Sequence, residues 1–307
     1  MMDIKPYYPG FVRKAITFTI DDGNLDMDEK FLHYVRPAGI KGTFNLCSNN
    51  LGRMSAQAYR DFYEGYEIAN HCKYHPFAFD DGTEYAVKDT PFDEATAAPA
   101  FLYPSREDPR LYMIHTVRGW RKIASTENYI RFMDEGKSEL ESVFGRGSIS
   151  GFVWPFHPPK NEKVLRYAIN ADYESVRAVY HLGEGAARHF ALPEDWKAWV
   201  YTAADTTLTA YSQEYAACPD DGTLKFFAVG VHSIDFEHSG SWDALDAFCR
   251  DFGHREDMYW YASNHEICQY AQAMQSLRAE NGIPINESGV TLYLSVDGEK
   301  VTLPPKG

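Results

Sequence analysis

The chain has 307 residues, 44% of them hydrophobic, which is enough to bury a large core in one α/β barrel or in two smaller domains. Its formal net charge of −14 argues against nucleic acid and anionic membranes as partners, because both bind clustered lysine and arginine. No apolar run in the sequence reaches the length of a membrane span.

Two features of the sequence bear on location. Residues 1–12 lack the charged-then-apolar pattern of a signal peptide, and the five cysteines are scattered without a CxxC pair, which is typical of reduced thiols. We therefore expect a cytoplasmic protein, and an exported protein whose leader has been removed is the alternative.

The first 75 residues alternate between apolar runs and helical stripes. A buried strand is predicted at residues 15–18, a helix at 26–36, a strand at 42–47, a helix at 55–64 and a short apolar segment at 66–69. The first strand ends in Thr19-Ile20-Asp21-Asp22-Gly23, and the apolar segment leads into Asn70-His71-Cys72-Lys73-Tyr74-His75. Chemically active side chains thus follow two of the predicted strands.

Residues 76–125 break this alternation. The segment contains five prolines, many acidic residues and several aromatic side chains. Its length is typical of a functional or disordered loop, and its aromatic content argues against disorder. We expect an inserted segment that packs beside the active site and shapes its rim, with a purely decorative surface insertion as the alternative.

The rest of the chain returns to alternating strands and helices. We predict helices at 126–144, 161–171, 206–217, 242–252 and 264–278, strands at 148–156, 173–179, 224–231 and 258–261, extended chain at 196–202, and no regular pattern at 181–193. Residues 290–296 and 299–303 flank Asp297-Gly298, which predicts a β-hairpin.

These elements together predict an α/β fold. We expect a distorted (β/α) barrel of seven parallel strands with outer helices in residues 1–280, with the segment 76–125 inserted into it. Residues 281–307 form a C-terminal β-hairpin extension in this prediction, which could cap a sheet edge or make a small oligomer contact.

The adjacent carboxylates of Asp21 and Asp22 are the first candidate site. Like charges this close raise each other's pKa, and a bound cation relieves the repulsion. One carboxylate can then hold a metal while its neighbour takes a proton from water. Asp-Asp-Gly is also ordinary turn chemistry, so the pair alone does not decide between a turn and a site.

Three histidines extend this candidate site. His71 and His75 form an HxxxH pair, and two neutral imidazoles with one carboxylate suit Zn²⁺, Co²⁺, Ni²⁺ or Fe²⁺. His232 ends an apolar strand, a position that points to the active-site face in barrel-like α/β folds. Surface helices also produce HxxxH by chance, and a strand-end histidine can be an ordinary core residue.

Taken together, these stretches resemble the polysaccharide deacetylase (NodB-homology) family, carbohydrate esterase family 4. The family signature has T-F-D-D-G, H-[S/T]-x-x-H, R-x-P-Y and L-x-H elements in that order. The corresponding residues here are Thr19-Ile20-Asp21-Asp22-Gly23, His71-Cys72-Lys73-Tyr74-His75, Val153-Trp154-Pro155-Phe156 and Gly230-Val231-His232. The resemblance runs from about residue 14 to about residue 277.

The resemblance implies a metal-dependent hydrolase that removes N- or O-acetyl groups from a carbohydrate. It implies one divalent ion, with Zn as the first choice and Co, Ni or Fe as alternatives. Asp22, His71 and His75 would hold the metal, Asp21 would be the general base and His232 the general acid. A carboxylate would keep His232 cationic, and Asp235 is the nearest candidate in sequence. A backbone N–H near Phe156 would stabilise the oxyanion.

Four positions depart from the family pattern. Val153 stands where the family often has an arginine that orients the catalytic aspartate, and this places activity in question. Cys72 replaces a serine or threonine; a thiol of low pKa could compete as a ligand, but we expect it to pack inward. Phe156 replaces a tyrosine, which matters little if only its N–H acts. Gly230 replaces a leucine, and we expect a wider pocket wall there.

The substrate is predicted from the residues around the third motif. We take Trp154, Pro155, Phe156 and His157 as substrate-binding, with Trp196 and Trp199 as further stacking candidates, although such aromatics are often core. The expected partner is an acetylated mono- or oligosaccharide, with no nucleic acid or membrane partner and with a homo-oligomer allowed.

Three alternative functions stay open at this point. The first is hydrolysis of linear amides other than acetamides on the same fold. The second is a catalytically inactive, carbohydrate-binding relic, and the third is an unrelated Fe²⁺ enzyme that uses two histidines and one carboxylate for oxidation.

Overall fold

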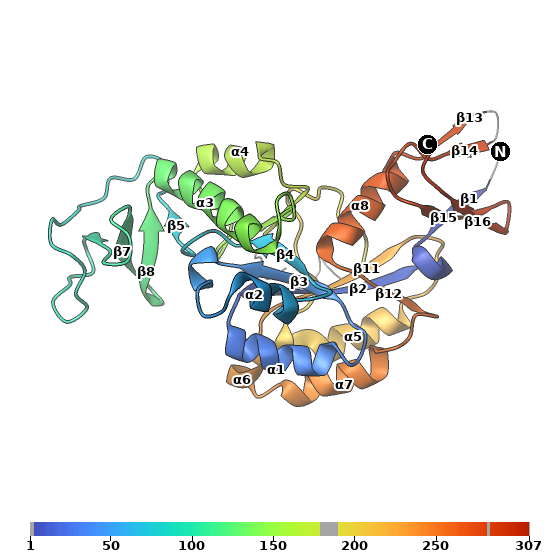
Figure 1. Cartoon of the computed structure of the whole chain (residues 1–307), viewed down its shortest axis with the longest axis horizontal. Coiled ribbons are helices and arrows are strands. Elements are labelled where there is room, and N and C mark those ends of the chain that lie inside the picture. The colour runs from blue at the N-terminus through green and yellow to red at the C-terminus, as the bar shows by residue number, and fades with distance from the viewer. Residues whose placement is uncertain (1–2, 179–189, 281–282, 307) are drawn as a thin grey trace. The chain divides into compact units, whose positions relative to one another are not determined.

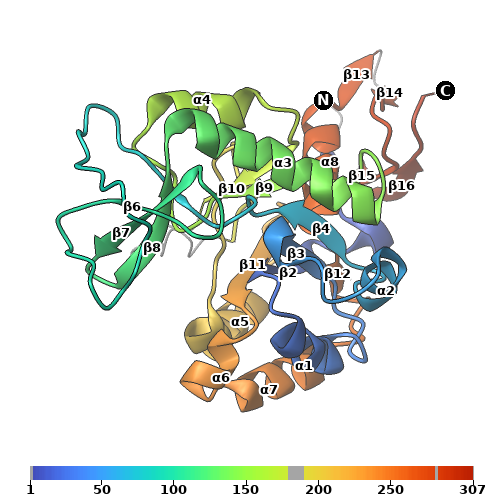
Figure 2. The same cartoon turned by 60° about the vertical axis from the view of Figure 1, so that its left-hand side comes forward.

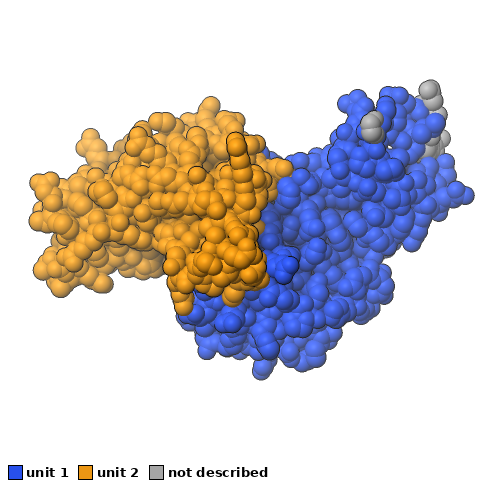
Figure 3. Space-filling model, viewed as in Figure 1, with its two compact units in different colours: residues 1–44, 63–67, 180–307 blue, residues 45–62, 68–179 orange. Residues whose placement is uncertain are grey.

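A computed structural model describes residues 3–178, 190–280 and 283–306 (Figure 1). The chain forms two compact units, coloured separately in Figure 3. Unit 1 comprises residues 1–44, 63–67 and 180–307, and unit 2 comprises residues 45–62 and 68–179. Within the described ranges, no helix is both long enough and apolar enough to cross a bilayer.

The predicted α/β fold, a distorted barrel of parallel strands with helices outside, is confirmed. Its strands have the order β10-β9-β4-β3-β2-β11, and β12 also pairs with β2. These strands are β2 (Lys14–Asp22), β3 (Gly42–Leu46), β4 (Glu67–Asn70), β9 (Gly151–Val153), β10 (Ser175–Arg177), β11 (Lys225–His232) and β12 (Tyr259–Tyr261). The chain passes from unit 1 into unit 2 within β3 and again within β4.

Unit 1 is built on the long parallel pair β2 and β11. Their register runs from Lys225↔Lys14 to His232↔Asp21, so the two strands end together. The helices of this unit are α1 (Leu25–Val35), α5 (Leu208–Ala217), α6 (Asp235–Ser239), α7 (Trp242–Phe252) and α8 (Asn264–Gln275). Figure 1 shows α1, α5, α6 and α7 gathered on one side of β2 and β11. Apolar side chains fill that side: the Phe18 ring of β2 lies 5.3 Å from Phe31 and 5.5 Å from Phe248.

A buried acid ties α1 to the loop that follows β11. Asp28 is fully buried; its carboxyl accepts a hydrogen bond from Ser233 Oγ at 2.6 Å and another from Tyr63 OH at 2.8 Å. Burial raises the pKa of this carboxyl to about 7, although the two hydroxyls act in the opposite direction. Since Ser233 follows His232 directly, this buried acid also helps to hold the end of β11.

The predicted C-terminal hairpin is confirmed. Strands β15 (Leu292–Val296) and β16 (Glu299–Leu303) pair antiparallel, and Asp297 and Gly298 between them have φ of 50° and 91°. Left-handed backbone at both positions matches the twist of a tight hairpin. The N-terminal strand β1 (Ile4–Tyr7) adds to β15, a pairing that no local pattern predicted. Strands β13 (Arg278–Glu280) and β14 (Ile283–Ile285) form a second small antiparallel pair.

Unit 2 packs its part of the sheet against α3 (Thr126–Phe144). Asn70 Nδ2 donates to the Met133 carbonyl of this helix at 2.8 Å and to Tyr173 OH at 2.8 Å. The helix approaches so closely at Gly136 that a Cβ there would lie 2.6 Å from Asn70 Oδ1, which explains the glycine inside a helix. The other helices of this unit are α2 (Ala56–Phe62) and α4 (Glu162–Asn170).

The segment 76–125 is more regular than expected. It contains β5 (Phe77–Ala78), β6 (Tyr103–Pro104), β7 (Leu111–Thr116) and β8 (Gly119–Ala124), in the order β5-β8-β7-β6. Strands β6, β7 and β8 are labelled in Figure 2. The prediction of a patternless segment was therefore wrong. Strands β7 and β8 form an ordinary hairpin, and the prolines and acids around it hid its alternation.

The remaining differences are local. The extended chain predicted at 196–202 carries no assigned strand, and only Ala203 makes a bridge, to Val229. Of the patternless stretch predicted at 181–193, residues 181–189 lie outside the described residues. Short 3₁₀ turns occur at Pro9–Phe11, Ser48–Asn50 and Asp205–Thr207.

The raised pKa of Asp28 predicts a pH-dependent stability. Between about pH 4 and pH 7 the folded chain binds a proton at Asp28 that the unfolded chain has released, so stability from this group is present below pH 4 and falls as pH rises through 7. Asp28→Asn should remove up to about 4 kcal/mol of this decline. Urea unfolding of both proteins at pH 4.5 and 8 measures it, and equal declines in both proteins would contradict the assignment.

Candidate active site

Unit 1 brings together the acidic pair and one histidine. The β2–β11 register sets His232 beside Asp21 on neighbouring strands. His232 Nε2 lies 3.8 Å from Asp22 Oδ2, and His232 Nδ1 donates to Asp235 Oδ2 at 2.9 Å. The same Asp235 oxygen accepts the backbone N–H of His232 at 2.8 Å. Asp235, the first residue of α6, is therefore the carboxylate that orients His232, and it leaves Nε2 facing the acidic pair.

The charges around His232 keep it protonated. Burial lowers the pKa of His232, but the hydrogen bond to Asp235 and the charges of Asp21, Asp22 and Asp235 outweigh burial and raise it to about 9. For Asp235, burial raises the pKa, and the hydrogen bond and charge of His232 bring it below its usual value. The pair is thus an imidazolium and a carboxylate at neutral pH, and the imidazolium can donate a proton.

Unit 2 contributes His71 and His75. His71 is 1% exposed, and its Nδ1 lies 2.9 Å from the carbonyl oxygen of Val153. A carbonyl only accepts, so Nδ1 carries a proton, and in the neutral form of the ring Nε2 is the nitrogen that has the lone pair. Metal-binding histidines in proteins typically donate their second ring nitrogen in this way. The centroid of the His75 ring lies 4.8 Å from that of His71. The imidazole nitrogens of this loop are therefore suitable ligands for a divalent metal.

Two cysteines lie next to these histidines. Cys72 is fully buried, and burial raises the pKa of its thiol to about 12, so it packs as a neutral group, as expected. Cys47, at the end of β3, donates from Sγ to the His71 carbonyl at 3.3 Å. That thiol supports the backbone of His71, a role that no sequence motif indicated.

Unusual backbone conformations mark all the predicted motifs except the last. Positive φ occurs at Asp22 (78°), Cys72 (65°), His75 (54°) and Phe156 (62°). The other described non-glycine residues with positive φ are Phe11, Phe190, His254 and Asp297. Left-handed backbone is strained for such side chains, and this strain gathers at functional sites, where the surroundings enforce it. It also shows that His71 and His75 sit on a kinked loop and not on a helical turn.

The predicted substrate-binding residues separate into two groups. Trp154 is 3% exposed and packs against Phe152, with ring centroids 5.1 Å apart, so it is a core residue here; Pro155 is also buried. Phe156 and His157 are accessible. The Phe156 ring stacks on Phe77 at 3.9 Å, which links this loop to the first strand of the 76–125 segment.

The two further tryptophans are also core. Trp196 and Trp199 are 4% and 3% exposed and pack on Phe226, with ring centroids 5.7 and 5.8 Å from it. Neither is available to stack on a sugar in this conformation.

The expectation of a wider pocket wall at Gly230 is wrong. A Cβ on Gly230 would lie 2.2 Å from Cδ1 of Tyr201 and 2.3 Å from its Cγ. The space that a leucine side chain would occupy is therefore filled by the Tyr201 ring, which is 8% exposed.

The structure also reveals a buried arginine that no sequence motif indicated. Arg177 of β10 is completely buried and pairs in register with Val153 of β9. Register partners in parallel strands point to the same face of the sheet. One residue earlier on each strand, Asn70, Phe152 and Val176 are register partners of one another. The Asn70 side chain donates a hydrogen bond to α3, so these three residues face that helix. Val153 and Arg177 therefore face away from α3. A guanidinium thus lies one strand away from the position where the family motif has its arginine.

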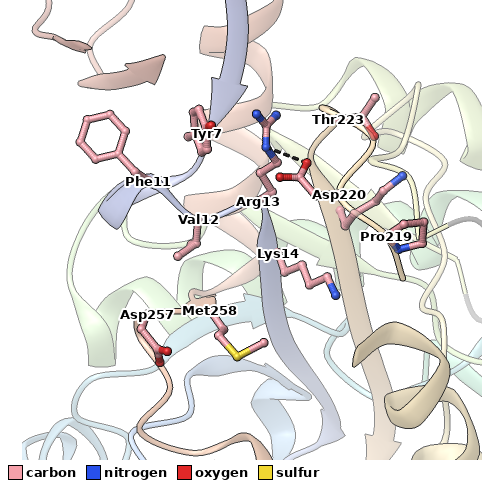
Figure 4. A pocket seen from close by; sticks show the side chains of 11 residues that line it. Tyr7, Phe11, Val12, Arg13, Lys14, Pro219, Asp220, Thr223, Asp257 and Met258 are labelled. Carbon is pink, nitrogen blue, oxygen red and sulfur yellow. Dashed lines mark ion pairs between the residues drawn. The ribbon is translucent and has the colours of Figure 1, made fainter. Parts of the chain in front are cut away.

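A pocket elsewhere in unit 1 does not coincide with these residues. It has a volume of about 190 Å³ and is lined at the beginnings of β2 and β11 by residues that include Lys14, Lys225 and Met258 (Figure 4). Arg13 in its wall is paired with Asp220 at 2.9 Å, and Lys14 Nζ donates to two backbone carbonyls. Asp21 and His232 lie at the opposite ends of the same strands, where α/β barrels carry their chemistry.

Comparisons with known proteins agree with the motifs. No curated protein matches the chain. The solved structures that it resembles include a putative polysaccharide deacetylase from Mycobacterium smegmatis, with 14% identity, a TM-score of 0.52, and coverage of 88% of this chain and 94% of that one. They also include a family 4 acetyl xylan esterase from Clostridium thermocellum in complex with a cobalt ion (13%, 0.45, 82% and 89%) and the peptidoglycan deacetylase PdaC from Bacillus subtilis (15%, 0.44, 86% and 95%).

At 14% identity, the Mycobacterium smegmatis structure speaks for the fold alone. The sequence itself matches the polysaccharide deacetylase family model over residues 10–176, more than half of the 307 residues. The chain therefore belongs to the polysaccharide deacetylase family.

Proposed function

We propose that this protein is a metal-dependent deacetylase that hydrolyses N- or O-acetyl groups of a mono- or oligosaccharide. Family membership supports a hydrolase of this class. The observation that carries the proposal is the His232 pair: a histidine oriented by Asp235, with a pKa raised to about 9, lies at the same strand ends as two adjacent carboxylates. Such a cluster separates an acid from a base within one site.

Asp22, His71 and His75 are the proposed metal ligands. When bound, a divalent ion supplies Lewis acidity, which polarises the acyl carbonyl and lowers the pKa of water. Zn²⁺ is our first choice, with Co²⁺, Ni²⁺ or Fe²⁺ as alternatives, because imidazole and carboxylate donors suit all four. The His71 ring supports this role through its bond to Val153, which reserves Nε2 for a ligand.

The remaining groups handle protons. Asp21 accepts a proton from the water whose oxygen attacks the acetyl carbon, and the backbone N–H of Phe156 donates to the oxyanion. The bond between the acyl carbon and the sugar nitrogen or oxygen then breaks. His232 Nε2 protonates the departing amine or alcohol, and acetate is the second product. Asp235 keeps His232 in the protonated form that this step needs.

The direct test is acetate release from a panel of acetylated sugars. With Zn²⁺, Co²⁺, Ni²⁺ or Fe²⁺ added back after chelation, we expect acetate from at least one N- or O-acetylated sugar, and none from the chelated protein. Release of a different acid or amine from linear amides would instead favour the amide-hydrolase alternative. Oxygen consumption without acetate would contradict the proposal.

Two substitutions distinguish the role of the metal ligands from the role of the general base. His75→Ala should lose metal and activity together, because a ligand is removed. Asp21→Asn should keep the metal and lower kcat by a factor of about 100 or more, because the proton acceptor is lost. Metal content by atomic spectroscopy and acetate release measure both effects, with Cys72→Ser as a control that should keep its metal. An Asp21→Asn protein of nearly full rate would refute the base assignment.

The role of Asp235 can be tested in the metal-free protein. Asp235→Asn removes the hydrogen-bonding carboxylate, so the pKa of His232 should fall from about 9 toward the usual value for histidine. The charges of Asp21 and Asp22 remain and should prevent a complete return. An NMR titration of the His232 ring measures this shift, with the exposed Asp243→Asn in α7 as the control. An unchanged His232 titration would show that Asp235 does not hold its charge.

A further inference from the structure

We infer that Phe77, in the segment inserted at 76–125, is a positioning residue for the active site. Its ring holds Phe156 in place, and through Phe156 it orients His75. The inference rests on the proposed function, in which the backbone N–H of Phe156 donates to the oxyanion and His75 binds the metal. It starts from a row of three rings in contact, all of which belong to unit 2.

The ring of Phe156 contacts the other two rings. Its centroid lies 3.9 Å from that of Phe77, and the planes of these two rings are almost parallel, at 8°. The centroid of the His75 ring lies 4.3 Å from that of Phe156, with 73° between the planes, so these two rings meet edge to face. Aromatic contacts depend on the angle between the rings as well as on their distance. Phe77 therefore constrains the orientation of Phe156, and Phe156 constrains that of His75.

The backbone at Phe156 and His75 depends on such support. The φ angle is 62° at Phe156 and 54° at His75, in the left-handed region that residues other than glycine rarely adopt. Such a conformation persists only where the surrounding structure enforces it. The direction of the Phe156 N–H is set by this backbone, so a contact that restrains the Phe156 ring also keeps the N–H in its orientation.

The inserted segment fixes Phe77 through its own strands. Phe77 lies in β5, which pairs with β8, and Phe79 N donates to the Ala124 carbonyl at 2.9 Å. A second contact joins the same segment to the loop that carries Phe156. Asn161, the N-cap of α4 at the end of that loop, is 1% exposed, and its Nδ2 donates to the Phe79 carbonyl at 2.9 Å. The inserted segment thus holds the Phe156 loop through the ring stack and through this buried hydrogen bond.

Loss of the Phe77 ring should weaken two properties of the site at once. Groups that orient a metal-binding histidine typically contribute about 10- to 100-fold to metal affinity or activity, so we expect metal affinity to fall about tenfold. One oxyanion donor is worth about 100- to 1,000-fold in kcat. A donor that is displaced but still present should cost about tenfold in kcat, with KM nearly unchanged, because it acts on the transition state.

The experiment compares Phe77→Leu and Phe77→Ala with the wild type. Leucine keeps apolar volume but has no flat face, and alanine removes both. Competition with a chromophoric chelator measures the affinity for Zn²⁺, and acetate release from the acetylated sugar that the wild type hydrolyses best gives kcat and KM. Both variants should bind Zn²⁺ about tenfold more weakly and lose about tenfold in kcat. Phe77→Tyr keeps the ring and should retain both wild-type values.

Phe79→Leu is the matched control. Phe79 is also half-buried in the inserted segment, and its ring packs on Tyr85 with the centroids 4.5 Å apart. This substitution removes one aromatic ring from the segment, as Phe77→Leu does, so the two melting temperatures should fall by similar amounts. Zn²⁺ affinity and kcat should fall in Phe77→Leu and stay near the wild-type values in Phe79→Leu.

The possible failures are distinguishable. If the wild type releases acetate but Phe77→Leu matches the Phe79→Leu control in Zn²⁺ affinity and in kcat, the inference is overturned and the proposed function stands. If no metal supports acetate release from any acetylated sugar, the proposed function fails. The Zn²⁺ affinities then decide the inference alone: a loss confined to the Phe77 variants supports the positioning of His75, and equal affinities overturn it.

Discussion

The parallel pairing of β2 with β11 is the interaction on which the candidate site depends. Its hydrogen bonds hold the two strands in one register from Lys14 to Asp21, so the acidic pair and His232 emerge at the same level. If β11 were shifted by one residue against β2, the His232 side chain would point to the opposite face of the sheet, away from the acidic pair. The aromatic side chains that pack against these strands, and the hydrogen bonds of the buried Asp28, fix the strands relative to the helices of unit 1.

Electrostatics give two acids of unit 1, Asp28 and Asp235, different protonation behaviour. Burial without a cation raises the pKa of Asp28 to about 7, whereas the pKa of Asp235, which bonds to His232, is lowered. His232 in turn is kept charged by three carboxylates. The same residue type is thus partly protonated near neutral pH in one environment and ionised in another.

Two of the four departures from the family motifs, Val153 and Gly230, follow a common pattern. Where the motif arginine is replaced by Val153, a buried Arg177 stands on the adjacent strand and on the same face. Where the motif leucine is replaced by Gly230, the ring of Tyr201 fills its space. In both cases a neighbouring segment supplies a side chain near the vacated position. A close-packed interior requires a side chain of suitable volume or charge at a given place, but that side chain can come from any segment that reaches the place.

The sequence by itself determined most of the helices and core strands, the family and the identity of the candidate groups. Helices such as α3 and α7 have strong apolar periodicity and clear ends, and the motif residues carry chemistry that few other arrangements need. What only the tertiary structure decided was contact between distant segments. The β7–β8 hairpin, the β1–β15 pairing, the core position of Trp154, and the placing of Tyr201 and Arg177 all depend on neighbours far along the chain. The local sequence pattern shows which face of a helix or strand is apolar. Which other element packs against that face depends on the tertiary structure.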